Sequence, residues 1–301
     1  MISFKILTEE SAEQLFREIC SATADTDGEF LSENIDMMLD DESEYALSHS
    51  DGCLLIRIFD GEYSFAYPIA MVDDAEPMAA VEQIRLYAIK EEIPLVFCDV
   101  PAEELGSLIP KFRHASIDAT DPDNECYTVR IMSEAAMLDE MPIVNGPDAV
   151  CLTPITEADD ELYFALATDL DTNKYWGYDY REDEPSPDKD YFRQNSSAEF
   201  NRGSALSLAV RVKGEFAGEA TLYSFDLLGG CECAVRLLPT FRGRGYATDA
   251  LNLLKRLAKS MGIVYLMATV DKENVASQRM TAKCLDEVLE TDSKVKYRTE
   301  L

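Results

Sequence analysis

Hydrophobic spacing in the second half of the chain is typical of both strands and helices. Apolar runs at 206–212 and 216–224 flank Gly214 and indicate a β-hairpin, and a third strand-like run covers 231–238. A long amphipathic helix is then predicted, because apolar residues recur every three or four positions at Ala247, Ala250, Leu251, Leu254, Leu257, Ala258 and Met261. The continuous apolar run 263–270 predicts a buried strand. The other predicted elements are strands at 150–152, 288–290 and 294–301 and helices at 158–167, 188–194 and 274–283.

The first half shows the same order of predicted elements. Asp60-Gly61 joins two strand-like runs, a strong hairpin signal. The predicted elements are strands at 2–7, 53–59, 63–70, 93–100 and 127–132 and helices beginning after Thr8, at 77–91 and at 102–109. Two prolines and an Asn-Gly pair indicate a break near 141–147. We therefore expect two domains, residues 1–142 and 148–301, built as two copies of one α/β fold.

The composition is that of a folded and strongly acidic protein. Hydrophobic residues make up 47% of the 301, which is enough for sizeable cores, and the net charge is −31 at pH 7. This charge argues against nucleic acids and anionic membranes as partners and favours cationic substrates. The charge is uneven, since residues 240–301 carry 11 basic and 8 acidic side chains and residues 1–239 carry 16 and 50.

Histidine and cysteine positions exclude several catalytic classes. Both histidines, His49 and His114, lie in the first half, so the second half cannot build a Ser-His-Asp triad or a His-based metal site. Cys231 and Cys233, two residues apart on one strand, cannot complete a tetrahedral zinc site, and we expect no metal. Because no signal peptide and no membrane-length apolar run is evident, we expect a cytoplasmic protein without disulfides.

The turn Arg-Gly-Arg-Gly-Tyr-Ala at 242–247 is the clearest candidate binding site. It joins the strand-like run 231–238 to the amphipathic helix. Glycines there leave backbone N–H groups accessible, and a helix N-terminus carries partial positive charge. Arg242 and Arg244 add donors suited to phosphate oxygens. The alternative is a plain strand–helix connection with surface arginines. Since the turn lies in the only basic segment of the chain, we expect a phosphate-bearing ligand.

Three ordered motifs in residues 148–301 fit one family. They are Arg242, Gly245 and Ala247 in the pattern Arg/Gln-x-x-Gly-x-Gly/Ala, the preceding strand from Glu232 to Pro239, and a later Asn274-x-x-Ser277 followed by Lys283. In this order they resemble the GNAT superfamily of acyltransferases, particularly its ribosomal-protein N-terminal acetyltransferase branch. Two positions depart from the family: Cys284-Leu285-Asp286 replaces its apolar-Gly-Phe run, and Thr281 stands where a tyrosine is common.

The resemblance implies a fold and a cofactor. The expected fold is two GNAT-like domains, each a mixed, mainly antiparallel twisted sheet flanked by helices. The expected co-substrate is acetyl-CoA, with its pyrophosphate held by Arg242, Gly243, Arg244, Gly245, Tyr246 and Ala247. Its pantetheine arm would run along the preceding strand, with the thioester carbonyl against a backbone N–H near Leu237. Asn274 and Lys283 would also contact the cofactor.

Candidate catalytic residues follow from the same resemblance. An amine must lose a proton to attack a thioester, and Glu232 on the strand before the turn is the expected base. Ser277 is the candidate for contact with the leaving thiol. Each residue has an ordinary alternative: Glu232 as a surface glutamate, Asn274 as a helix N-cap, and Ser277 as a simple helix residue.

An acceptor pocket is expected around residues 173–180, which carry the only tryptophan of the chain and three tyrosines. Trp176 and Tyr178 are typical of pocket walls, and Asp179 could hold a cationic amine. The alternative is a small satellite core beneath a long loop.

The first domain is expected not to bind CoA. Its equivalent of the turn is the stretch 71–78, which has no glycine or arginine and has three acidic residues that would repel a pyrophosphate. We therefore expect an enzyme that moves an acetyl group from acetyl-CoA to a primary amine, with catalysis in the second domain alone. The alternative is an inactive CoA-binding or protein-interaction pseudoenzyme. The sequence leaves the oligomeric state open.

Overall fold

The structure is a computed structural model in which the chain forms two compact units. One unit comprises Met1–Ser133 with Asp226–Leu228, and the other comprises Glu134–Phe225 with Gly229–Leu301. The structure describes residues 5–6, 44–48, 53–60, 63–71, 85–86, 88–90, 92, 94–101, 115–121, 126–133, 138–146, 150–176, 179–182, 184–290 and 293–301. Within these ranges, no helix is long and apolar enough to cross a membrane.

A mixed, mainly antiparallel sheet forms the centre of the second unit. Its described strands are β8 (Val144–Asn145), β9 (Val150–Thr153), β10 (Ala205–Val212), β11 (Glu215–Tyr223), β12 (Gly230–Leu237), β13 (Tyr265–Asp271), β14 (Glu287–Glu290) and β15 (Lys294–Glu300). They lie in the order β14-β15-β13-β12-β11-β10-β9-β8, and β12–β13 is the parallel pair. The predicted hairpin is confirmed: Lys213 and Gly214 join β10 to β11 with φ of 54° and 88°, as a tight hairpin turn requires.

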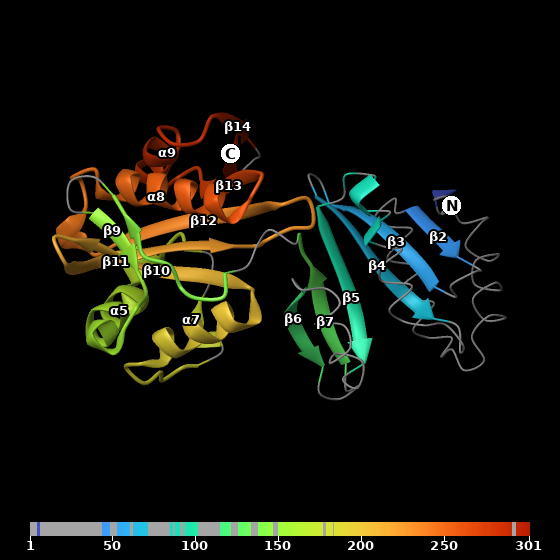
Figure 1. The fold of residues 1–301 in the computed structure, drawn as a ribbon, viewed down its shortest axis with the longest axis horizontal. Coiled ribbons are helices and arrows are strands. Elements are labelled where there is room, and N and C mark those ends of the chain that lie inside the picture. Colours follow the sequence, from blue (N-terminus) through green and yellow to red (C-terminus); the bar gives the residue numbers. More distant parts are fainter. Residues whose placement is uncertain are drawn as a thin grey trace. The chain divides into compact units, whose positions relative to one another are not determined.

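Helices cover the two faces of this sheet (Figure 1). α8 (Tyr246–Met261) packs on one face, and α5 (Asp160–Thr168) and α7 (Tyr191–Arg202) pack on the other. The short α6 (Leu170–Asn173) follows α5, and α9 (Val275–Thr281) follows β13. Burial of Ala250, Leu251, Leu254, Leu257 and Ala258 confirms the central part of the predicted stripe of α8, and Ala247 and Met261 at its ends are half-buried. The core beneath α5 and α7 comprises Tyr163, Leu166, Ala167, Phe192, Ala209 and Phe216.

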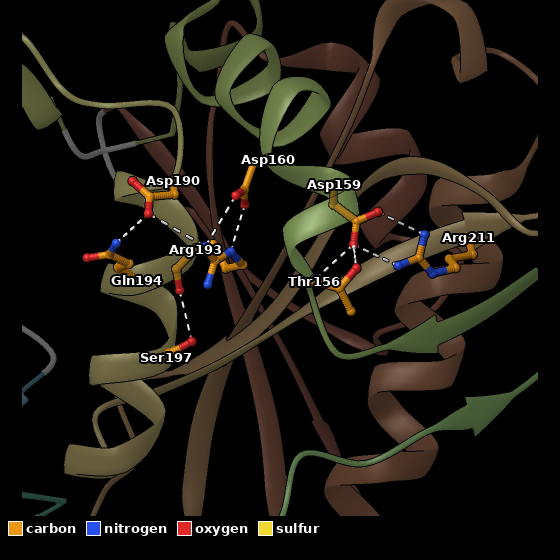
Figure 2. Close-up of polar contacts among 8 residues, drawn as sticks. All are labelled: Thr156, Asp159, Asp160, Asp190, Arg193, Gln194, Ser197 and Arg211. Atoms are coloured by element: carbon orange, nitrogen blue, oxygen red, sulfur yellow. Dashed lines mark hydrogen bonds and ion pairs between the residues drawn. The ribbon is translucent and has the colours of Figure 1, made fainter.

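Two ion pairs fix the start of α5 (Figure 2). The buried Asp159 accepts hydrogen bonds from Arg211 of β10, at 3.0 Å from Nη1 and 2.7 Å from Nη2, and from the Thr156 amide at 2.8 Å. Burial by itself would raise the pKa of Asp159, but the donors from Arg211 and Thr156 outweigh it and lower the pKa. The neighbouring Asp160 pairs with Arg193 of α7 at 2.7 Å, so charged groups tie α5 to both the sheet and α7.

A second mixed sheet forms the first unit. Its described strands are β1 (Lys5–Ile6), β2 (Glu44–Ser48), β3 (Cys53–Asp60), β4 (Tyr63–Met71), β5 (Leu95–Pro101), β6 (Ala115–Asp121) and β7 (Cys126–Ile131). Their order is β1-β2-β3-β4-β5-β7-β6, with β4–β5 as the parallel pair. The second sheet has the same strand order: β9, β10, β11 and β12 are antiparallel neighbours, β12 pairs in parallel with β13, and β15 lies between β13 and β14. In the first sheet the corresponding strands are β1 to β4, then β5, and then β7 between β5 and β6.

Several predicted elements differ from the structure. α7 runs to Arg202, well beyond the predicted end at 194. Most of its residues are polar, so no apolar periodicity indicated that the helix continues. β2 and β6 were not predicted, since Glu44–Ser48 and Ala115–Asp121 mix apolar and polar residues over short runs. The predicted break at 141–147 contains the short strand β8. The helices predicted after Thr8 and at 102–109 lie outside the described residues, and the one at 77–91 is described only at 85–86 and 88–90.

Candidate functional site

The turn between β12 and α8 presents unpaired backbone amides. Gly243 and Gly245 adopt φ of 74° and 90°, a left-handed conformation that other residues adopt at a cost. Gly245 is the N-cap of α8, and no side chain caps this helix end. Among the described residues, the amides of 243–248 donate no hydrogen bond, and the first backbone bond into the helix comes from Asp249 to the Gly245 carbonyl at 3.1 Å. This arrangement can bind an anion through several amides at once.

The two arginines of the turn have different surroundings. The Nε of Arg242 donates to the Leu237 carbonyl at 2.9 Å, and its Nη2 donates to the Thr172 hydroxyl at 2.6 Å. Arg242 therefore braces the turn against the end of β12 and against α6, and only part of its guanidinium remains for a ligand. Arg244 is exposed on the turn, and the ring of Tyr246 lies 6.5 Å from that of Phe241.

Beside the turn, no strand of the described part of the chain pairs with one edge of β12. β12 pairs with β13 only at 230–232, whereas its pairing with β11 continues to Leu237. The Leu238 amide donates to the Ala217 carbonyl of β11, so alternation along the strand directs the amides of Val235 and Leu237 to the other edge. β12 and β13 therefore diverge beyond Glu232, and an extended ligand can pair with the exposed backbone of β12.

Glu232 lies on the sheet face that α5 and α7 cover. Alternation along β12 places it on the same face as Arg236, which pairs with Glu219 of β11. Its side chain is half-buried, and the Tyr223 hydroxyl donates to its Oε2 at 3.2 Å. The carboxylate is thus held at the last paired position of β12 and β13, where the two strands begin to diverge.

The three site residues predicted after β13, which are Asn274, Ser277 and Lys283, differ in burial and in hydrogen bonding. Asn274 is the N-cap of α9, and its Oδ1 accepts from the Ser277 amide at 3.1 Å. This confirms the ordinary alternative for Asn274, and since no described residue accepts from its NH₂ group, that group leaves room for a ligand role as well. Ser277 is half-buried on α9, and Lys283 is exposed after it.

Comparison with known proteins adds the decisive observation. Residues 149–284, which include β12, the turn and α9, match the family model described as an acetyltransferase (GNAT) domain. The second unit contains a GNAT domain. No curated protein matches the sequence.

Several solved structures are similar to this GNAT domain in fold. RimL, a ribosomal L7/L12 alpha-N-protein acetyltransferase in complex with coenzyme A, is 15% identical over 53% of this chain and 98% of its own, with a TM-score of 0.45. RimJ of Mycobacterium smegmatis, with CoA-disulfide, is 19% identical over 53% and 86%, with a TM-score of 0.43. The spermidine N-acetyltransferase of Vibrio cholerae, with CoA and spermine, is 13% identical over 50% and 95%, with a TM-score of 0.42.

Of the positions where the GNAT domain departs from its family, Thr281, Cys284 and Leu285 are buried and Asp286 is exposed. Thr281 is 1% exposed and Cys284 is 5% exposed. The Cys284 thiol donates to the Thr248 carbonyl at 3.8 Å, and burial raises its pKa, so the thiol stays protonated at neutral pH. Cys284 is therefore a packing residue and not an activated nucleophile.

On the expected acceptor side of the GNAT domain, the structure describes two of the three predicted residues. The ring of Trp176 lies 4.2 Å from the guanidinium carbon of Arg236, and Asp179 forms an exposed ion pair with Arg181. Tyr178 lies outside the described residues. Sequence reasoning missed Arg236, although a charged residue inside the apolar run Cys233–Leu238 is itself a signal of a buried pair.

Proposed function

We propose that the second domain transfers an acetyl group from acetyl-CoA to a primary amine. One observation carries this proposal: the unpaired amides of the turn continue directly from the free edge of β12. A diphosphate group with an attached amide-bearing arm fits that combination, because the turn binds anions and the strand edge pairs with an extended chain. The bound CoA or CoA-disulfide named in the RimL and RimJ structures accords with this ligand.

The cofactor would be held by the predicted set of residues. Amides of Gly243, Arg244, Gly245, Tyr246 and Ala247 would hold the pyrophosphate, with Arg242 bracing the turn. The amide of Leu237 would pair with the pantetheine arm. Asn274 and Lys283 would contact the cofactor from the side of α9.

The spacing along β12 constrains the position of the thioester. Leu237 lies five positions after Glu232, a span of roughly 16 Å in an extended strand. Val235, whose amide faces the same free edge as that of Leu237, is roughly 10 Å from Glu232. We therefore place the thioester carbonyl at the Val235 amide, with Glu232 acting through a bridging water.

The chemistry then needs no covalent enzyme intermediate. The amine nitrogen attacks the thioester carbonyl, the C–S bond breaks, and the products are an amide and CoA. Glu232 takes the proton of the amine through the water. The Val235 amide stabilises the developing oxyanion, and Ser277 contacts the departing sulfur.

The first unit is proposed to be a GNAT-like copy that does not bind CoA. The shared strand order supports the duplication, because in both sheets the fourth of four antiparallel strands pairs in parallel with the next strand. In both sheets this parallel pairing is limited to a few residues, which in β4–β5 are Phe65–Ala66 with Leu95–Val96. The composition of 71–78, with three acids and no glycine, supports the loss of the cofactor turn.

The acceptor is proposed to be a cationic amine in a cytoplasmic setting. The net charge of −31 supports this preference, because a strongly negative surface concentrates cations. Trp176, Tyr178 and Asp179 would line the acceptor side. No nucleic acid or membrane is proposed as a partner.

Mass spectrometry tests the proposal directly. The full chain would be mixed with acetyl-CoA and a panel of amines that includes spermine and a peptide with a free α-amino group. The expected result is a product heavier by one acetyl group together with free CoA. Binding of CoA by calorimetry without any product across the panel would favour the pseudoenzyme. Absence of CoA binding by folded protein would refute both.

A further inference from the structure

Residues 169–176, here called the α6 segment, accept hydrogen bonds from two arginines, Arg242 of the cofactor turn and Arg236 of β12. The segment comprises Asp169, the helix α6 and the loop to Trp176. It follows α5, and it carries the only tryptophan of the chain. Arg242 reaches it from the cofactor turn and Arg236 reaches it from β12.

The first connection passes through Thr172. Its hydroxyl accepts from Nη2 of Arg242 at 2.6 Å and donates to the carboxylate of Asp169, the N-cap of α6. The Asp169 carboxylate also accepts from the Thr172 amide at 2.7 Å. The same guanidinium holds the Leu237 carbonyl, so a single side chain joins the turn, the end of β12 and the start of α6.

The second connection passes through Asn173. Arg236 donates to the Asn173 Oδ1 and to Oε2 of Glu219, and its guanidinium carbon lies 4.2 Å from the centre of the Trp176 ring. The Nδ2 of Asn173 donates to the carbonyls of Leu166 and Asp169, each at 2.8 Å. Arg236 is 9% exposed and Glu219 is 4% exposed, so this connection is rigid and largely dry.

We propose that Arg236 and Arg242 are positioning residues that couple the cofactor turn to the acceptor side through the α6 segment. The inference rests on the proposed function, in which CoA occupies the turn. A diphosphate on the turn amides restrains Arg242, Arg242 restrains Thr172, and the α6 segment then holds Trp176 more firmly against Arg236. Binding of CoA thereby positions Trp176, which lines the acceptor side of the site.

Trp176 makes the coupling measurable, because its emission is the only tryptophan signal of the protein. The experiment measures acrylamide quenching of Trp176 with and without CoA, alongside calorimetry of CoA binding to the same samples. The test variant is Thr172→Val, which removes the junction hydroxyl and keeps the backbone amide. Thr168→Val is the matched control, because the Thr168 hydroxyl donates only to the Phe164 carbonyl, one turn earlier in α5.

The proposal makes distinct expectations for the three proteins. In the unmodified protein and in Thr168→Val, CoA lowers the quenching constant. In Thr172→Val, CoA binds with an affinity within roughly fivefold, the range of one lost hydrogen bond, and the change in quenching disappears. Heat of CoA binding without a change in quenching in the unmodified protein would overturn the coupling alone, as would a full change in Thr172→Val. Absence of heat in folded protein would overturn the proposed function as well.

Discussion

Substitution of Gly245 by alanine tests whether the turn binds its ligand through backbone conformation. Gly245 has φ of 90°, and a Cβ placed on it meets no protein atom within 4 Å, so alanine causes strain without a clash. A left-handed conformation costs an L-residue about 1–2 kcal/mol. The turn can relieve this strain by rotating φ, and the amides of 245 and 246 then no longer point together.

The matched control is Gly214→Ala in the β10–β11 hairpin. Gly214 has φ of 88° and is equally open, so Gly214→Ala should lose about 1–2 kcal/mol of unfolding free energy in urea, whereas Gly245→Ala should lose less, because its turn relaxes in the unbound protein. Only Gly245→Ala should weaken CoA binding by calorimetry, by up to roughly five- to thirtyfold, because the bound state restores the strained conformation that the unbound turn has relaxed. Equal CoA affinity for the two variants would refute the assignment of these amides to the cofactor.

Three further predictions concern the base, the buried ion pair and the buried thiol. Glu232→Gln should lower kcat by roughly a hundredfold or more and should retain CoA binding. The control Glu215→Gln, at an exposed position, should leave kcat unchanged, and an unchanged kcat in Glu232→Gln would reject Glu232 as the base. Asp159→Asn should lower the free energy of unfolding by about 3 kcal/mol, because it leaves Arg211 without its charged partner. Asp160→Asn should cost less, because the Asp160 side chain is 17% exposed and that of Asp159 is 4% exposed; equal losses would contradict this. Cys284→Ser should retain turnover within roughly twofold, and an acyl adduct on Cys284 would contradict its buried, protonated state.

The Asp159 prediction has a defined pH dependence. Its pKa in the folded protein is lowered below the ordinary value of 3.8, so the stabilisation is complete above that value and is lost as the pH falls through the lowered pKa. In acid, the difference between the unmodified protein and Asp159→Asn should therefore shrink. A difference that is constant down to about pH 2 would show that the charge of Asp159 does not carry the effect.

Local chemistry made much of the second domain predictable from the sequence. The glycines of the turn, the apolar stripe of α8 and the Gly214 hairpin each depend on dihedral preferences or on spacing within one element. The same local features carried the resemblance to the GNAT family, which the match at residues 149–284 confirms. The predicted end of α7 was wrong because most of its residues are polar and only Phe192 and Ser196 are buried, so its pattern carries little hydrophobic signal.

Only the tertiary structure decided how the site is assembled. The divergence of β12 from β13, the hydrogen bond from Arg242 to Thr172 and the buried Arg236–Glu219 pair each depend on contacts between residues far apart in the chain. Strand pairing and side-chain hydrogen bonds of this kind are set by register and packing, which no window of neighbouring residues encodes. The sequence by itself thus determined which segment can bind an anion, and the fold determined that this segment adjoins a free strand edge and a braced α6 segment.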